Sequence, residues 1–155
     1  MSYKRVMHER FMKIALEQAR KAKGEVPVGA IIVGADGKII ASAHNQVESK
    51  NDCTQHAELL AIKLAAEKRK NWRLDDCSMY VTLEPCTMCI GAILLARISK
   101  LYFGCYEPKM GAVGSVYDLS NHSKLPHQVQ VFPEILKQEC SDLLKGFFSK
   151  IRDTK

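Results

Sequence analysis

The sequence has no long apolar run, and none of its stretches approaches the ~20 residues that a membrane-spanning helix needs. It also lacks the apolar segment of a secretory signal, because charged residues are spread through residues 1–24. No internal repeat, low-complexity segment or linker divides the chain. These absences argue against a membrane or secreted protein and predict one cytoplasmic domain over residues 1–155.

The composition is that of an ordinary globular protein, with 46% hydrophobic and 26% charged residues. A net charge of +6 permits an anionic partner such as nucleic acid but does not require one. The chain contains 6 cysteines. Disulfides are rare in the cytoplasm, where close cysteine pairs usually bind metal or carry out redox chemistry.

The spacing of apolar residues predicts an α/β fold in which helices pack over a mixed sheet. We expect helices at residues 3–23, 56–70, 86–98 and 136–151. We expect strands at residues 28–33, 38–43, 77–83, 99–104 and 128–132, with the first two joined by a turn at Asp36-Gly37. Residues 45–54 read as a loop, and a helix between two short strands predicts that those strands are parallel.

The sequence also predicts which residues begin or bury three of these helices. Leu60, Leu64 and the alanines should form the inner side of the second helix. Pro85 should open the third helix, because its missing N–H needs no partner in a first turn. An apolar stripe that includes Cys140, Phe147, Phe148 and Ile151 should pack the last helix onto the core.

The stretch "TLEPCTMCIG" places Cys86 and Cys89 in the first turn of a helix and on one face. A helix amino terminus lowers thiol pKa values and favours the thiolate that binds divalent metals. A redox pair is the first alternative, but no thioredoxin-like surroundings accompany these cysteines. The pair therefore favours a metal site that needs further ligands.

"QHAE" supplies a histidine, His56, and a carboxylate, Glu58, at the start of another helix. The pattern H-x-E followed by P-C-x-x-C is a signature of zinc deaminases. His56, Cys86 and Cys89 would hold one zinc ion and leave its fourth position to water, whose pKa falls towards ~7. Glu58 would shuttle protons, although residues i and i+2 of a regular helix point apart.

Cys53 could be a fourth protein ligand of the same metal ion. Together with His56, Cys86 and Cys89 it could build a closed Cys3His site. A closed zinc site is structural and leaves no position for water. The protein would then be a non-catalytic RNA-binding or scaffold protein, and Glu58 would have no role.

The sequence resembles the bacterial tRNA-specific adenosine deaminases, of the cytidine deaminase-like superfold, over nearly its whole length. The matching stretches are "EVPVGAIIV", "AHN", "HAE", "NWRL", "YVTLEPCTMCIGA", "YFG", "GAVGS" and the terminal "FF". The resemblance implies a three-layer α-β-α fold with about five strands and a homodimer with one zinc per subunit. It also implies deamination of the wobble adenosine of an arginine tRNA anticodon stem-loop to inosine, by attack of zinc-bound hydroxide on the purine C6.

The resemblance also implies roles for single residues. Asn45 would hydrogen-bond the flipped base, Val28 would line the pocket, and the Ala57 N–H would touch the purine. Glu107 and Lys109 would approach the RNA backbone, with Lys145, Lys150, Arg152 and Lys155 on the last helix as further candidates. As an alternative to packing in the core, one of Phe147 and Phe148 would face the RNA. The family usually has proline at Cys53, alanine at Gln55 and aspartate at Glu107, so the chemistry is better supported than the RNA contacts.

Other residues have structural interpretations. Glu84 should hold the loop beside Pro85, and Cys77, Cys105 and Cys140 should be small buried side chains. The superfamily signature by itself also permits a deaminase of a free base or nucleoside, such as guanine, cytosine or cytidine. A steep fall of activity with salt would favour tRNA over such neutral substrates.

Overall fold

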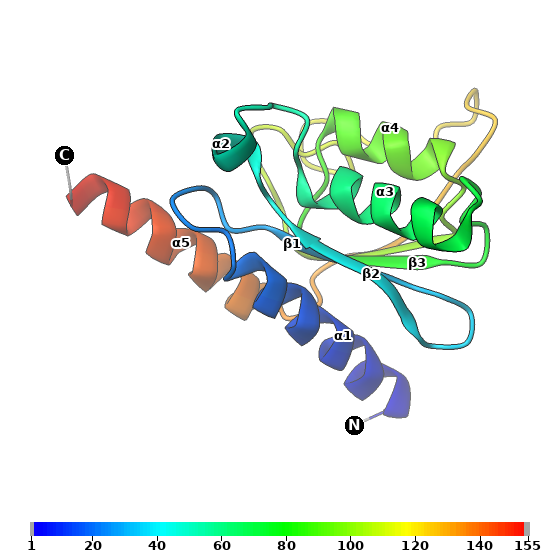
Figure 1. Cartoon of the computed structure of the whole chain (residues 1–155), viewed down its shortest axis with the longest axis horizontal. Helices are drawn as coiled ribbons and strands as arrows, with labels where there is room; N and C mark the ends of the chain where they lie inside the picture. The colour runs from blue at the N-terminus through cyan, green and yellow to red at the C-terminus, as the bar shows by residue number, and fades with distance from the viewer. Residues whose placement is uncertain (1, 154–155) are drawn as a thin grey trace.

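The computed structural model describes residues 2–153, which form a mixed five-stranded sheet with helices on both faces (Figure 1). Lys155, one of the basic residues considered above, lies outside the described residues. In chain order the elements are α1 (Tyr3–Ala19), β1 (Gly29–Val33), β2 (Ile39–His44), α2 (Val47–Lys50), α3 (Ala57–Arg69), β3 (Ser78–Leu83), α4 (Thr87–Leu95), β4 (Lys100–Cys105), β5 (Gln130–Phe132) and α5 (Lys137–Asp153). The predicted three-layer α/β fold is confirmed.

The strands lie in the order β2-β1-β3-β4-β5. β1 pairs antiparallel with β2, as the Asp36-Gly37 turn predicted, and also antiparallel with β3. β3, β4 and β5 run parallel, which confirms the parallel pair predicted around α4. The amino-terminal ends of α3 and α4 therefore lie at one edge of the fold, where the site is built (Figure 1).

Two apolar clusters hold the layers together, one on each face of the sheet. Helices α3 and α4 cover one face, and α1 and α5 cover the other (Figure 1). Every residue of β1 is buried, because helices cover both faces of the sheet. A strand that is covered on both faces is a continuous apolar run in the sequence. No helix within residues 2–153 has the length and apolar character needed to cross a membrane.

Helix α1 lies close against β1 because Gly29 has no side chain. A Cβ at Gly29 would collide with the Ala15 carbonyl oxygen. Helix α1 ends at Ala19 instead of continuing to residue 23 as the spacing predicted. The chain then makes a turn, in which Ala22 donates its N–H to the Ala19 carbonyl, before Gly24 adopts a φ of +71°.

Three further expectations were wrong. Residues 45–54 are not only a loop, because they contain α2. Leu64 is 45% exposed, since the buried side of α3 is made by alanines that let it approach the sheet closely. Pro85 lies before α4, whose amino-terminal cap is Cys86. The difference at Leu64 arises from how closely α3 approaches the sheet, which periodicity does not report.

Candidate metal centre and active site

A cavity of about 510 Å³ opens at the amino-terminal ends of α3 and α4. Its wall includes His56, Glu58 and Cys86, which are three of the four residues assigned to the metal centre from their spacing. Elements from both halves of the chain meet here, because the loops after β2 and β3 deliver α3 and α4 to the same end of the sheet. The cavity is therefore the candidate active site.

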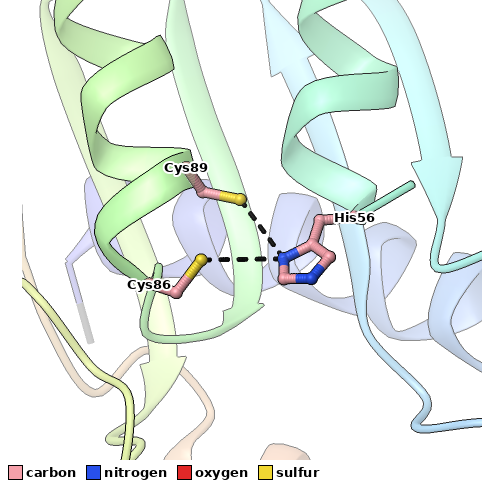
Figure 2. Close-up of side chains that lie close together, drawn as sticks. All are labelled: His56, Cys86 and Cys89. Carbon is pink, nitrogen blue, oxygen red and sulfur yellow. Dashed lines mark hydrogen bonds between the residues drawn. The ribbon is translucent and has the colours of Figure 1, made fainter. Parts of the chain in front are cut away.

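His56, Cys86 and Cys89 converge beside this cavity (Figure 2). Nδ1 of His56 lies 3.7 Å from Sγ of Cys86 and 3.4 Å from Sγ of Cys89. The ligand atoms of all three residues lie within 4.8 Å of one another. His56 caps α3 and Cys86 caps α4, so the backbone changes direction where each side chain must point inward.

The three side chains fit a zinc ion. Zn–S bonds of ≈ 2.3 Å and Zn–N bonds of ≈ 2.0–2.1 Å in a tetrahedron separate the sulfur and nitrogen ligands by about 3.6 Å. The two distances from His56 agree with that separation. Two thiols and one imidazole leave the fourth zinc position open, as catalytic zinc sites require. The zinc-binding character predicted for the chain thus has a geometric basis.

The protonation of the cysteine pair is set by mutual hydrogen bonding. The hydrogen bond from Cys89, together with the one that His56 donates, lowers the pKa of Cys86 to about 4. The same contact and burial raise the pKa of Cys89, so the first proton leaves more easily than the second. The hydrogen bond with Cys86 also raises the pKa of His56. A divalent cation between these groups would stabilise the second thiolate, which is the metal-binding form.

Glu58 is only 4% exposed and lies in the first turn of α3. Burial raises its pKa above the ordinary value for glutamate. Its side chain reaches the cavity together with that of His56 because His56 is outside the regular helix, with φ −78° and ψ 148°. The irregular cap therefore overcomes the i, i+2 spacing that would separate the two side chains in a continuous helix.

Cys53 lies outside this centre. Its side chain is exposed, and among residues 2–153 the group that could hold a metal comprises only His56, Cys86 and Cys89. The Cys53 loop is held instead by Asp52, whose carboxylate accepts hydrogen bonds from the Thr54 N–H and hydroxyl. The geometry therefore favours the open site over the closed Cys3His alternative.

The structure also places the residues expected to contact substrate. Val28, Asn45 and Glu107 line the cavity, whereas Lys109 is exposed beyond its wall. The Asn45 amide accepts a hydrogen bond of 2.9 Å from the Ala57 N–H. It also donates one of 3.3 Å to the Val26 carbonyl, so it ties the start of α3 to the segment that leads into β1. The substrate contacts of these residues stay predictions.

Glu84 has the structural role expected of it, although it holds a more distant loop. Its buried carboxylate accepts hydrogen bonds from the N–H groups of Glu107, Val113 and Ser115 and from the Ser115 hydroxyl. Gly111 passes so close that a Cβ there would collide with the Glu84 carboxyl carbon. Glu84 thus fixes the loop that carries Glu107 to the cavity.

Replacing Glu84 with alanine should lower the free energy of unfolding by about 2–4 kcal/mol, because three N–H groups lose their acceptor. Urea denaturation of the zinc-loaded protein measures this change. Glu17→Ala is the matched control, because Glu17 is exposed on α1 and its loss should stay within about 0.5 kcal/mol. Equal stabilities of the two variants would show that Glu84 does not hold the loop.

Part of the apolar stripe of α5 lies at the site, where the family resemblance implied only basic residues of this helix and one of its two phenylalanines. Phe147, Phe148 and Ile151 line the cavity, and Phe148 is 44% exposed. They were expected to pack into the core with Cys140, but the carboxyl-terminal half of α5 runs past the sheet (Figure 1). The length of the apolar stripe in the sequence could have indicated this, because the stripe is longer than the part of α5 that packs on the sheet.

Comparison with known proteins assigns the chain to a family. A family model described as the cytidine and deoxycytidylate deaminase zinc-binding region matches residues 5–105. The tRNA-specific adenosine deaminase of Bacillus subtilis is 43% identical, with 95% of this chain and 92% of that protein covered. That of Aquifex aeolicus is 47% identical, with 94% and 96% covered.

Solved structures agree with these relatives. A structure from a study of A-to-I editing by tRNA:A34 deaminases at the wobble position superposes with a TM-score of 0.83 at 42% identity. It covers 87% of this chain and 99% of that one. A guanine deaminase from Bacillus subtilis superposes with a TM-score of 0.60 at 33% identity, covering 77% and 87%. The predicted zinc cofactor is confirmed by the zinc-binding family and the three converging ligands. The chain belongs to the tRNA-specific adenosine deaminases, within the cytidine and deoxycytidylate deaminase zinc-binding family.

Proposed function

We propose that the protein deaminates the wobble adenosine of a tRNA, producing inosine and ammonia. The observation that carries this proposal is the cluster of His56, Cys86 and Cys89 at a cavity that also holds buried Glu58. It occurs in a chain that belongs to the tRNA-specific adenosine deaminases. The reaction is a hydrolysis, in which the oxygen of water replaces the amino nitrogen at the purine C6.

His56, Cys86 and Cys89 would hold zinc through one ring nitrogen and two sulfur atoms. Zinc bound there would lower the pKa of a water molecule towards ~7 and so supply a nucleophile at neutral pH. Glu58 would accept the proton of the attacking water at its carboxylate. It would pass the proton to a ring nitrogen of adenine and then assist the departure of ammonia. Burial suits Glu58 to both tasks, because a raised pKa brings acid and base forms closer to neutral pH.

The cavity would receive the base after it leaves the RNA stack. An anticodon loop already splays its bases, so extrusion costs less there than from a duplex. We assign Val28 to the pocket wall, Asn45 and the Ala57 N–H to the base, and Glu107 and Lys109 to the RNA backbone. Support comes from the position of Val28, Asn45 and Glu107 on the cavity wall. Exposed Lys145, Lys150 and Arg152 on α5 extend the basic surface.

We further propose that the substrate is the anticodon stem-loop of an arginine tRNA, and that residues 1–155 act as one deaminase domain in the cytoplasm. A reducing compartment would keep the 6 cysteines of the chain as thiols. All 6 are free in the structure. The thiolates that would bind zinc depend on this state.

The test is incubation of zinc-loaded protein with an arginine-tRNA anticodon stem-loop that carries a wobble adenosine. Inosine in the digested product, measured by mass spectrometry, is the expected result. Activity should also fall steeply with salt, because phosphate contacts release counterions. Guanine, cytosine and cytidine are assayed in parallel. Turnover of one of these without inosine formation in RNA would replace the proposal with a free-base or nucleoside deaminase.

We also propose that the protein is a homodimer formed through the exposed side of α4. Met88 and Leu95 lie seven residues apart and hence on one side of this helix, and Leu95 is 70% exposed. The adjacent loop adds Met110, Val116 and Tyr117, all of them exposed, and Tyr117 contacts Thr87 on α4. An exposed apolar patch of this kind is typical of a protein interface.

Leu95→Glu should weaken the dimer at least about tenfold, because it places a charge in the centre of the proposed interface. Sedimentation velocity across a concentration series measures the dissociation constant. Leu64→Glu is the matched control, because Leu64 is 45% exposed on α3, outside this patch. The α4 interface is excluded if both variants sediment like the unmodified protein.

A further inference from the structure

A second cavity, of about 330 Å³, adjoins the candidate active site. Glu25 and Asn45 belong to the walls of both cavities. The second cavity is built from the segment between α1 and β1, the end of β2, and α2. It therefore lies next to the cavity that would receive the target base.

This second cavity is basic. Three exposed lysines line it: Lys21, Lys23 and Lys50. None of the three takes part in an ion pair found among residues 2–153. We call this group of lysines and the cavity between them the basic pocket.

The single carboxylate in the wall of the basic pocket is already engaged. Glu25 is 6% exposed, and its Oε1 accepts hydrogen bonds from the N–H groups of Val47 and Glu48. Its Oε2 accepts one from the Ser49 N–H. Glu25 therefore directs its carboxylate at the amino terminus of α2, and with three lysines against this one carboxylate the wall of the pocket stays positively charged. His44 is also on the wall, and burial and the nearby Lys21 lower its pKa.

A group of unpaired ammonium ions around a concave surface suits an anion with several oxygens. The base that enters the neighbouring cavity remains joined to its strand, so a backbone phosphate must lie close to the cavity mouth. We propose that the basic pocket binds a backbone phosphate of the substrate strand, next to the nucleotide whose base is deaminated. This inference rests on the proposed function.

The basic pocket would also contribute to specificity. A free base or nucleoside has no phosphate and gains nothing from Lys21, Lys23 or Lys50. An RNA strand gains binding energy outside the chemical centre, and this gain should lower KM without changing the chemical step. The pocket shares Asn45 with the active-site cavity, so a phosphate held there would lie next to the nucleotide whose base is deaminated.

The first experiment measures steady-state kinetics of stem-loop deamination for Lys21→Gln, Lys23→Gln, Lys50→Gln and the triple variant. Each single change should raise KM roughly two- to fivefold with kcat unchanged, the range expected for an exposed charge pair. A plot of log(kcat/KM) against log salt concentration should have a slope that is shallower by about 0.7 for the triple variant. The reason is that this variant neutralises one phosphate fewer on a single strand. Lys38→Gln is the matched control, because Lys38 is exposed at the tip of the β1–β2 hairpin and should change neither quantity.

The second experiment identifies the phosphate. Stem-loops with one neutral methylphosphonate linkage, placed in turn on each side of the target adenosine, are tested with the unmodified protein and the triple variant. One linkage should raise KM for the unmodified protein and have no further effect on the triple variant. The inference is overturned if the unmodified protein forms inosine while the lysine variants behave like Lys38→Gln, or if the effects of linkage and variant are additive at every position. Absence of inosine with the unmodified protein would overturn the proposed function itself and this inference with it.

Discussion

Replacing Glu58 with glutamine should lower kcat by about 10²–10⁴-fold while the protein keeps its zinc, because general acid–base catalysis typically supplies that factor. Glutamine fills nearly the same buried volume but cannot accept the proton of the attacking water. Glu58 lies within the first turn of α3 and is 4% exposed, so the shape of the cavity should be preserved. KM for the stem-loop should stay close to its unmodified value, since the RNA contacts lie elsewhere.

The measurement combines single-turnover kinetics on the stem-loop with metal analysis of the same preparation. Glu48→Gln is the matched control, because Glu48 also lines the cavity but is exposed on α2 and has no place in the chemistry. Loss of activity together with loss of zinc would assign Glu58 to the integrity of the metal centre instead. Retained turnover in Glu58→Gln would remove it from the mechanism altogether.

Replacing Cys86 with alanine should abolish stoichiometric zinc binding and with it the deaminase activity. Removal of groups that only support metal ligands already costs 10–100-fold in affinity, so removal of a ligand should cost more than about 100-fold. Cys53→Ala should leave zinc content and activity unchanged, since Cys53 is exposed and outside the cluster. Both variants remove a thiol group, one inside the cluster with His56 and one outside it.

Zinc content by elemental analysis, and zinc release followed with a chromogenic chelator, measure the two variants side by side. Because ligands must lose their protons to bind metal, release from the unmodified protein should accelerate as the pH falls. Equal zinc loss in Cys53→Ala and Cys86→Ala would restore the closed Cys3His site. A zinc-replete Cys86→Ala protein would instead mean that the metal has another ligand.

Local sequence was sufficient to predict the strands and helices and most of the metal centre, but not the order of the strands in the sheet. The apolar runs in β1 and β3 and the apolar spacing in α3 and α4 are properties of neighbouring residues, and each predicted element exists. The bounds were less accurate at α1, because its carboxyl terminus depends on the turn that leads to Gly24. The spacing of His56 and Glu58, and of Cys86 and Cys89, indicated zinc chemistry because each pair sits at a helix terminus.

Tertiary structure decided which residues surround that chemistry. Glu25 caps α2 from more than twenty residues away, and no local pattern predicts this contact. The reach of α5 into the cavity and the exclusion of Cys53 likewise depend on where separate segments pack. The zinc ligands and Glu58 follow from chain-local spacing, whereas the cavity walls and the basic pocket arise only when distant segments are brought together by burial of the sheet.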